Sequence, residues 1–394
     1  RTGAGGEANA DGEPEAAAAP APDLSFLDET CLLTELLLPL PTFREVPRAA
    51  QLPLAELTGS LCSAAASAAA GSPEAEQAWK LLLLHHRLLL WAPAAERAAG
   101  RARRRAQQEL VLDRLGRAVR GDWEGLLEEA QAAAAAARTR RAGATASTGL
   151  AGAALAGEVI RRVSLGELGR AAQLLGQAKV AAPSPEVRDE LQSLLVTLAA
   201  ERGLLPADHS SDEEVPARDL ATALRKAPRS SGAGPSGSRF THWQACQLSA
   251  SSMAALGQVV NLVASGRVPT GAATALALTC LTPLRKKNGR LRPVAAGETL
   301  RRLTGKGLAR AQAQLLAEAV GPRQFGVGTP GGTEALSHAA QVEAGRRPQA
   351  AFVALDLRNA FGGLDRDAVL AAVQEHAPGL LHYARLFLGR RSAY

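Results

Sequence analysis

A short stretch of the chain is dense in basic side chains. Between residues 285 and 310, nine residues are Lys or Arg and Glu298 is the one acid. The nine are Arg285, Lys286, Lys287, Arg290, Arg292, Arg301, Arg302, Lys306 and Arg310. Bases at a tight turn and on the strand after it can converge on a phosphate group, to which Arg gives two parallel hydrogen bonds and Lys a point charge. Charge alone favours the plainer interpretation, a solvated basic hairpin.

Asp356 is the second candidate for chemistry. It stands near the end of a short apolar run, residues 351–357, which is typical of a buried strand. An ionised Asp there is well placed for a hard cation, because Mg²⁺ prefers oxygen ligands and usually takes one or two protein carboxylates. A lone Asp at a strand end more often caps a turn, so Asp356 alone does not decide between the two roles.

The elements that would position these residues can be predicted from local patterns. Residues 279–287 and 290–296 predict two strands joined at Asn288-Gly289, a dipeptide that readily adopts positive φ at both central positions of a hairpin turn. Asp365 is well placed to cap a helix that runs to about His376. Between these elements we expect a helix over 299–319, a glycine-rich loop over 326–332 and a helix over 333–343.

The chain divides into four parts. We expect a disordered acidic tail (1–23), a helical region (24–205), a linker with a Gly/Pro/Ser-rich turn (206–238) and a last part (239–394) that holds the hairpin and Asp356. The fold class is therefore mainly α with a C-terminal α+β part. Within the helical region, 81–90 predicts the buried stripe of a long helix, 101–105 a solvated basic run, 142–157 a loose connection, and 158–179 and 186–201 two further helices.

Composition limits the classes of function. Residues 1–35 hold eight acids and one base, a net charge of −7. The whole chain has a net charge of +7, so residues 36–394 carry +14, which favours a polyanionic partner. The four cysteines lie far apart without a CxxC pair, which predicts reduced, buried thiols in an intracellular protein and no zinc site. We expect neither a secretory signal, since 1–23 lack an apolar segment, nor a membrane span.

Four motifs in order resemble a known enzyme family. They are GPSG (234–237), LTPLRKKNGRLRPVAAGETLRRLTGK (281–306), QFGVGTPGGTEALSHA (324–339) and FVALDLRNAF (352–361). Over about residues 217–394 the chain resembles the reverse transcriptases of non-long-terminal-repeat retrotransposons. The helical stretch 159–194 also looks like the segment that precedes the polymerase in them. The resemblance implies the fingers and first palm strand of a right-hand polymerase fold.

The resemblance also implies roles for single residues. Asp356 matches the first catalytic carboxylate, which binds both magnesium ions. Phe361 matches the bulky side chain that selects deoxynucleotides, and Arg292 matches the fingers arginine that contacts the incoming triphosphate.

Three more nucleotide contacts are implied. Lys286 or Lys287 would supply a second phosphate contact, and both stay open. Gln324 and Gly326 match the loop that packs near the nucleotide and the template.

The implied function is RNA-directed DNA synthesis for a mobile element. It would use Mg²⁺, deoxynucleoside triphosphates, an RNA template and a DNA primer, inside the cell and, in a eukaryotic host, in the nucleus. In this family further carboxylates lie in a Tyr-x-Asp-Asp turn, and this sequence has no such motif and no Asp after Asp367. We therefore expect the chain to be the front part of the enzyme, inactive alone. Ser236 and Gly362 depart from the acidic or polar residues usual at those positions.

Two alternatives belong to other classes of protein. One is a nucleic-acid-binding remnant of a retroelement that keeps the basic fingers without catalysis. The other is a helical protein-interaction scaffold in residues 24–205.

Overall fold

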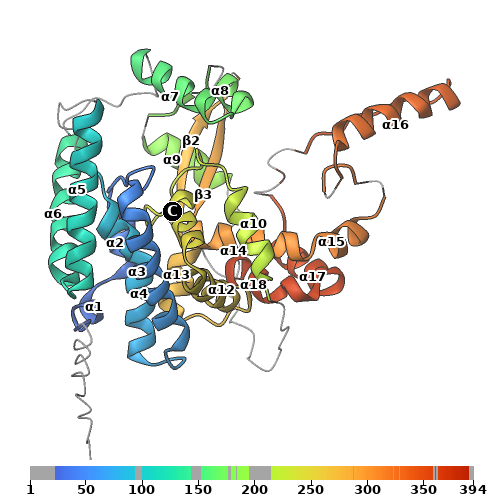
Figure 1. Cartoon of the computed structure of the whole chain (residues 1–394). Helices are drawn as coiled ribbons and strands as arrows, with labels where there is room; N and C mark the ends of the chain where they lie inside the picture. The colour runs from blue at the N-terminus through green and yellow to red at the C-terminus, as the bar shows by residue number, and fades with distance from the viewer. Residues whose placement is uncertain are drawn as a thin grey trace, which may run out of the picture.

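The chain is mainly α-helical and carries one small antiparallel sheet (Figure 1). The computed structural model describes residues 23–93, 100–142, 152–175, 179–182, 184–194, 214–286, 288–322, 324–327, 329–357, 360 and 363–389. The helical fold class with a small sheet is thus confirmed at this level. No helix in these ranges is long and apolar enough to cross a membrane.

The N-terminal helices pack around one very apolar helix. They are α1 (Phe26–Glu29), α2 (Leu32–Leu37), α3 (Arg48–Ser67) and α4 (Pro73–Leu90). The hydroxyl of Ser72 accepts from the Ala75 N–H, and Pro73 follows at a position where its missing N–H costs nothing, so the sequence starts α4 there. Residues 81–90 are all buried, which confirms the predicted stripe.

Two long helices, α5 (Gly100–Val119) and α6 (Trp123–Ala142), lie side by side on the left of Figure 1. Gly121, with φ of 87°, makes the turn between them. The fully buried Arg114 donates to the carbonyl of Trp91 (2.8 Å) and lies 3.8 Å above its ring, which ties α5 to the end of α4. The basic run at the start of α5 is exposed from residue 102 to residue 105, as predicted.

The segment before the linker is more broken than predicted. The helix expected over 158–179 is wrong as a single element: α7 (Gly152–Ser164) and α8 (Leu168–Leu175) are separated at Gly166, whose φ is 74°. Lys179 lies in strand β1 (Lys179–Val180), and the next helix, α9 (Pro185–Ser193), ends before residue 201. The loose connection expected over 142–157 is wrong from residue 152, where α7 begins, and 143–151 lie outside the described residues.

The predicted hairpin is confirmed. Strands β2 (Thr279–Arg285) and β3 (Leu291–Gly297) pair antiparallel, with Leu284 opposite Arg292, and β1 pairs with β2 at the edge. The loop is longer than a two-residue turn: the Lys286 N–H donates to the Arg290 carbonyl, and the Gly289 N–H donates to the Lys286 carbonyl. Gly289 has a φ of 81°, so the loop between Lys286 and Arg290 needs glycine at that position.

One hydrophobic core joins the N-terminal helices to those around the hairpin. Gly59 of α3 lies so close to α12 that a Cβ there would meet the Ser252 hydroxyl at 2.6 Å. Phe240 and Trp243 are buried in this core, as predicted. Its remaining helices are α10 (Ala217–Arg225), α11 (Phe240–Trp243), the 3₁₀ helix η1 (Gln244–Leu248), α12 (Ala250–Ala264), α13 (Thr270–Ala277), α14 (Thr299–Ala311) and α18 (Leu381–Leu388), which follows the 3₁₀ helix η2 (Pro378–Leu380).

The elements after α14 are less packed. The helix expected over 299–319 is divided at Gln312 into α14 and α15 (Ala313–Val320), and the following helix is α16 (Gly332–Arg346). Neither α15 nor α16 has a buried residue, and α16 points away from the body in Figure 1. Asp365 caps α17 (Arg366–His376) as predicted, since its carboxylate accepts from the Ala368 N–H at 2.9 Å.

The strand predicted over 351–357 is wrong. These residues have no regular secondary structure and all are exposed, Leu355 to 88%. A strand is stable only when another strand pairs with it. The described strands form their own sheet, and none of them pairs with 351–357.

Three buried histidines lie together where α4 meets α11. Burial lowers the pKa of His85 to about 4 and that of His242 to about 3, and burial also lowers the pKa of His86. His242 accepts from the Arg239 N–H through Nδ1 and donates to the Phe43 carbonyl from Nε2, so its contacts suit the neutral ring. Both His85 and His86 contact the indole of Trp243.

These histidines should make the fold sensitive to acid. Below the ordinary pKa of 6.5 these histidines bind protons in the unfolded chain but stay neutral in the folded chain. The free energy of unfolding therefore falls as the pH is lowered. We expect the urea-unfolding free energy to drop between pH 7 and pH 5 by up to about 1.4 kcal/mol per ring for each pH unit. His242→Gln should reduce that pH dependence, and His376→Gln, at an exposed site, should not. Equal stability of the parent chain at both pH values would contradict this.

Candidate nucleotide-binding site

The hairpin presents a group of basic side chains to solvent. Arg285, Lys286, Arg290 and Arg292 are exposed, and among the described residues none of the four forms an ion pair with an acid. Arg285 donates to the Gly289 carbonyl across the loop at 2.9 Å. Four cations on one short hairpin can therefore meet a phosphate without first breaking a salt bridge.

The hairpin is supported from behind by α9. The Leu291 N–H donates to the Glu190 carboxylate at 3.0 Å, and the Leu291 side chain is buried against Val187 and Leu191. Lys179 of β1 lies opposite Arg285. The basic face is thus held by a small core of its own rather than by the loop alone.

The bases on α14 have a different role. Arg302 donates to the Ser231 hydroxyl (3.0 Å) and the Gly232 carbonyl (2.7 Å), and the Arg301 guanidinium lies 4.3 Å above the Phe387 ring. Burial lowers the pKa of both groups. The nine bases therefore do not converge on one phosphate, because these two hold the fold together. A run of charges in the sequence cannot show which members face inward.

The turn at 234–238 meets the end of the hairpin through a buried carboxylate. Glu298 accepts from the Ser236 N–H (3.0 Å), the Ser236 hydroxyl (2.8 Å) and the Thr299 N–H (2.7 Å). Burial raises the pKa of Glu298, and the bonds from Ser236 and Thr299 oppose that rise. Gly234 is required here, because a Cβ would lie 2.8 Å from the Glu298 backbone. We call this group the Glu298 junction.

The N-terminal helices reach the same turn. His86 of α4 places Nδ1 at 3.0 Å from the Ser238 hydroxyl, and the Thr42 hydroxyl donates to the Gly237 carbonyl. Thr299 donates to the Ser238 carbonyl at 2.6 Å. Glu298, His86 and Thr42 were not predicted as site residues, since a single acid, histidine or threonine carries no sequence signal without its distant partner.

Asp356 stands apart from the hairpin. It is exposed on the irregular segment 351–357, and in the described part of the chain no hydrogen bond or ion pair joins it to the hairpin bases. Those residues also contain no group of three or more His, Cys, Asp or Glu that could hold a metal ion. A magnesium ion needs ligands besides one carboxylate, so Asp356 could supply only part of such a site.

The other predicted residues are only partly described. The Gln324 side-chain oxygen accepts from the Gly326 N–H at 2.7 Å, which makes a local turn, and both residues are exposed. Nothing described joins this turn to the hairpin. Lys287 and Phe361 lie outside the described residues.

Comparisons with known proteins found no relative of this chain. No family model, no curated protein and no solved structure matches this chain.

Removing the Glu298 carboxylate should destabilise the whole body. Glu298→Ala leaves the buried N–H groups of Ser236 and Thr299 without their acceptor, at a cost of about 1–3 kcal/mol for each. We expect about 3 kcal/mol less unfolding free energy in urea. Glu128→Ala, at an exposed position on α6, should change it by about 0.5 kcal/mol or less. Equal effects of the two substitutions would show that the Glu298 junction is not essential to the fold.

Proposed function

We propose that residues 217–394 carry the fingers of an RNA-directed DNA polymerase of a mobile element. In this proposal the hairpin bases Arg292 and Lys286 or Lys287 bind the triphosphate of a deoxynucleotide. Asp356 would be one ligand of Mg²⁺, and Phe361, Gln324 and Gly326 would line the nucleotide pocket. An RNA template and a DNA primer are the nucleic acids that such an enzyme holds.

The observation that supports the proposal best is the Glu298 junction. Two of the four motifs, 234–237 and 281–306, are separated by more than forty residues, yet Ser236 and Glu298 bond directly at 2.8 Å. Motifs that act together in one site are expected to meet in space. The hairpin then carries exposed cations at its tip that form no ion pair with an acid among the described residues, which suits a triphosphate.

A nucleic-acid-binding protein without catalysis is the second candidate. It uses the same exposed hairpin bases and needs no metal ligand. The exposure of Asp356 and of its apolar neighbours, in a described part of the chain without a group of three or more possible metal ligands, is the observation that favours it. The two candidates agree on phosphate binding and differ only in synthesis.

Primer extension separates the two candidates. In the complete natural protein that carries this sequence, extension of a DNA primer on an RNA template should require Mg²⁺. Asp356→Asn should lower the rate about 1,000-fold or more, because a metal-binding carboxylate contributes several kcal/mol to phosphoryl transfer, with template binding unchanged. Asp367→Asn, also an exposed Asp in the same region, is the matched control and should stay active.

Two results would count against the polymerase proposal. If Asp356→Asn extends primers as well as the parent protein, the role given to Asp356 is wrong. If the parent protein binds template and primer but extends none, the non-catalytic candidate is favoured.

A further inference from the structure

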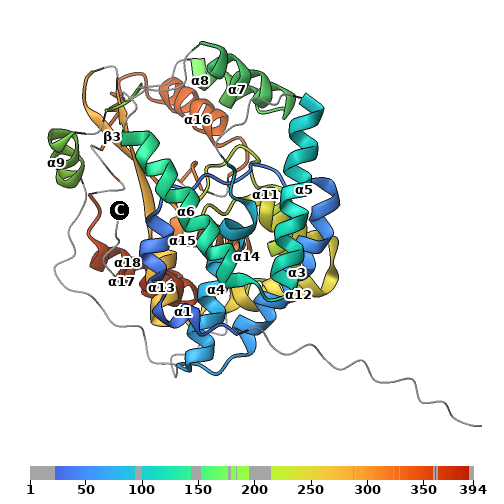
Figure 2. The same cartoon turned by 90° about the vertical axis from the view of Figure 1, so that its left-hand side faces the viewer.

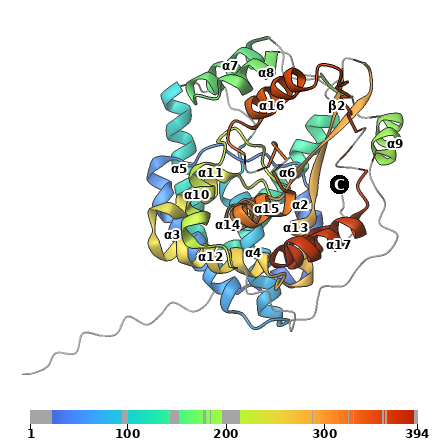
Figure 3. The same ribbon diagram turned by 90° about the vertical axis from the view of Figure 1, so that its right-hand side faces the viewer.

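A polar cleft of about 800 Å³ lies between the N-terminal helices and the segment that leads to the hairpin. Its walls come from the start of α3, the first turns of α5, the end of α10, and α11 with η1. Figures 2 and 3 show α5 and the β2–β3 hairpin on opposite sides of the molecule. The cleft is therefore a separate surface from the hairpin.

Four arginines and one glutamate line this cleft. The arginines are Arg48, Arg104, Arg225 and Arg229, and the acid is Glu45. All four arginines are exposed, and none forms an ion pair with an acid in the described part of the chain. Four guanidinium groups and a single carboxylate around one concave surface favour a ligand with several negative charges.

Four of the five glutamines that line the cleft are fixed in orientation. Gln51, Gln107, Gln244 and Gln247 each donate the side-chain amide nitrogen to a backbone carbonyl, at 2.8–3.2 Å. For Gln244 and Gln247 that carbonyl belongs to α10, so the amides also join the walls of the cleft. The amide oxygens remain as acceptors for hydroxyl or amino groups of a ligand. The polar lining is thus preorganised, which lowers the entropy lost on binding.

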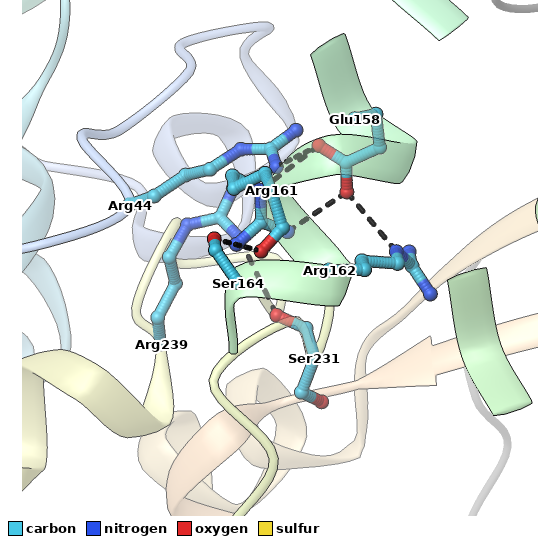
Figure 4. Close-up of polar contacts among 7 residues, drawn as sticks. All are labelled: Arg44, Glu158, Arg161, Arg162, Ser164, Ser231 and Arg239. Carbon is cyan, nitrogen blue, oxygen red and sulfur yellow. Dashed lines mark hydrogen bonds and ion pairs between the residues drawn. The ribbon is translucent and has the colours of Figure 1, made fainter. Parts of the chain in front are cut away.

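A second group of arginines adjoins the cleft. Figure 4 shows Arg44, Arg161 and Arg162 around the single carboxylate of Glu158, at 2.6–3.2 Å, with Arg239 beside them. The Arg44 carbonyl accepts from the hydroxyl of Thr241, which itself lines the cleft. The two groups are therefore linked through Arg44 and Thr241.

This second group has more positive charge than its acid can neutralise. The three arginines hold the pKa of Glu158 at about 2, with Arg161 the strongest influence. Burial, and then the charges of Arg44 and Arg161, lower the pKa of Arg239 to about 10. The Arg239 Nε has no hydrogen-bond partner among the described residues. An anion near Arg239 would offset both its burial and the repulsion by its neighbours.

We propose that this cleft, extended by the arginines around Glu158, binds the sugar–phosphate backbone of a single-stranded nucleic acid. The cleft is lined without any Trp, Tyr, Phe or His, so it offers no ring on which bases could stack. Recognition through phosphates is therefore sequence-independent and depends on salt. The site goes beyond the proposed function, since its wall at α5 lies across the molecule from the hairpin and it needs no catalytic role for Asp356.

Two matched triple variants of the 394-residue chain test the site. The cleft variant is Arg48→Gln, Arg104→Gln and Arg229→Gln. The control variant is Arg120→Gln, Arg138→Gln and Arg346→Gln, with the same change in charge at exposed positions that do not line the cleft. The probe is a fluorescein-labelled U oligomer of about 12 nucleotides, and its anisotropy is measured between about 50 and about 300 mM salt.

The cleft variant should bind about 100-fold more weakly near 0.1 M salt, and the slope of log K against log salt should fall by about 2, because each lost phosphate contact removes about 0.7. The control variant should lose much less affinity. Equal losses in both variants would overturn the proposal, since they would reflect net charge alone. Stronger competition by a poly-glutamate peptide than by unlabelled oligomer would also overturn it, because the site would then prefer an acidic peptide.

A hairpin variant keeps this test apart from the proposed function. The hairpin variant is Arg285→Gln, Arg290→Gln and Arg292→Gln. It should leave intact the crosslinking of a 4-thiouridine oligomer to peptides that contain residues 45–51 and 225–247. If crosslinks fall only on the hairpin and disappear in the hairpin variant, the cleft proposal is wrong and the proposed function stands. If crosslinks stay in the cleft but the complete natural protein extends no primer, the proposed function fails and the cleft proposal stands.

Discussion

The carboxylate of Glu298 is the interaction on which the rest of the structure depends. It binds the turn at Ser236 and the first N–H of α14 at the same time, so the end of the hairpin and the turn become one rigid unit. A buried carboxylate is costly unless several donors satisfy it, and here three donors do. Ser238 carries the connection onward to His86 of α4, which links the N-terminal helices to the same centre.

The arginines of the chain fall into two groups with different roles. Arg114, Arg301 and Arg302 are directed inward, where they bind carbonyls or lie over aromatic rings. The arginines of the hairpin and of the cleft remain exposed and unpaired with acids in the described residues. The inward group stabilises the fold, and the outward group is available to polyanions on two sides of the molecule. A net positive charge by itself would not reveal this division.

Local signals allowed much of the fold to be predicted. The hairpin at Asn288-Gly289, the cap at Asp365 and the buried stripe of α4 each depend on neighbouring residues, so the sequence was sufficient. Features that depend on distant partners were missed. Lys179 becomes a strand residue only because it pairs with Arg285. Glu298 joins the turn to the hairpin only because it accepts a hydrogen bond from Ser236. The strand over 351–357 was wrong for the same reason, since an apolar pattern does not supply a pairing strand.

The central claim is that the Glu298 junction holds a basic hairpin ready for nucleic acid. Hydrogen–deuterium exchange of the full chain, with and without an RNA template annealed to a DNA primer, tests this most directly. The account predicts slow exchange at 234–238 in both states, because those amides are already buried, and slower exchange at 284–292 only when nucleic acid is bound. Fast exchange at 234–238 in the free chain, or an unchanged hairpin in the bound one, would contradict the account.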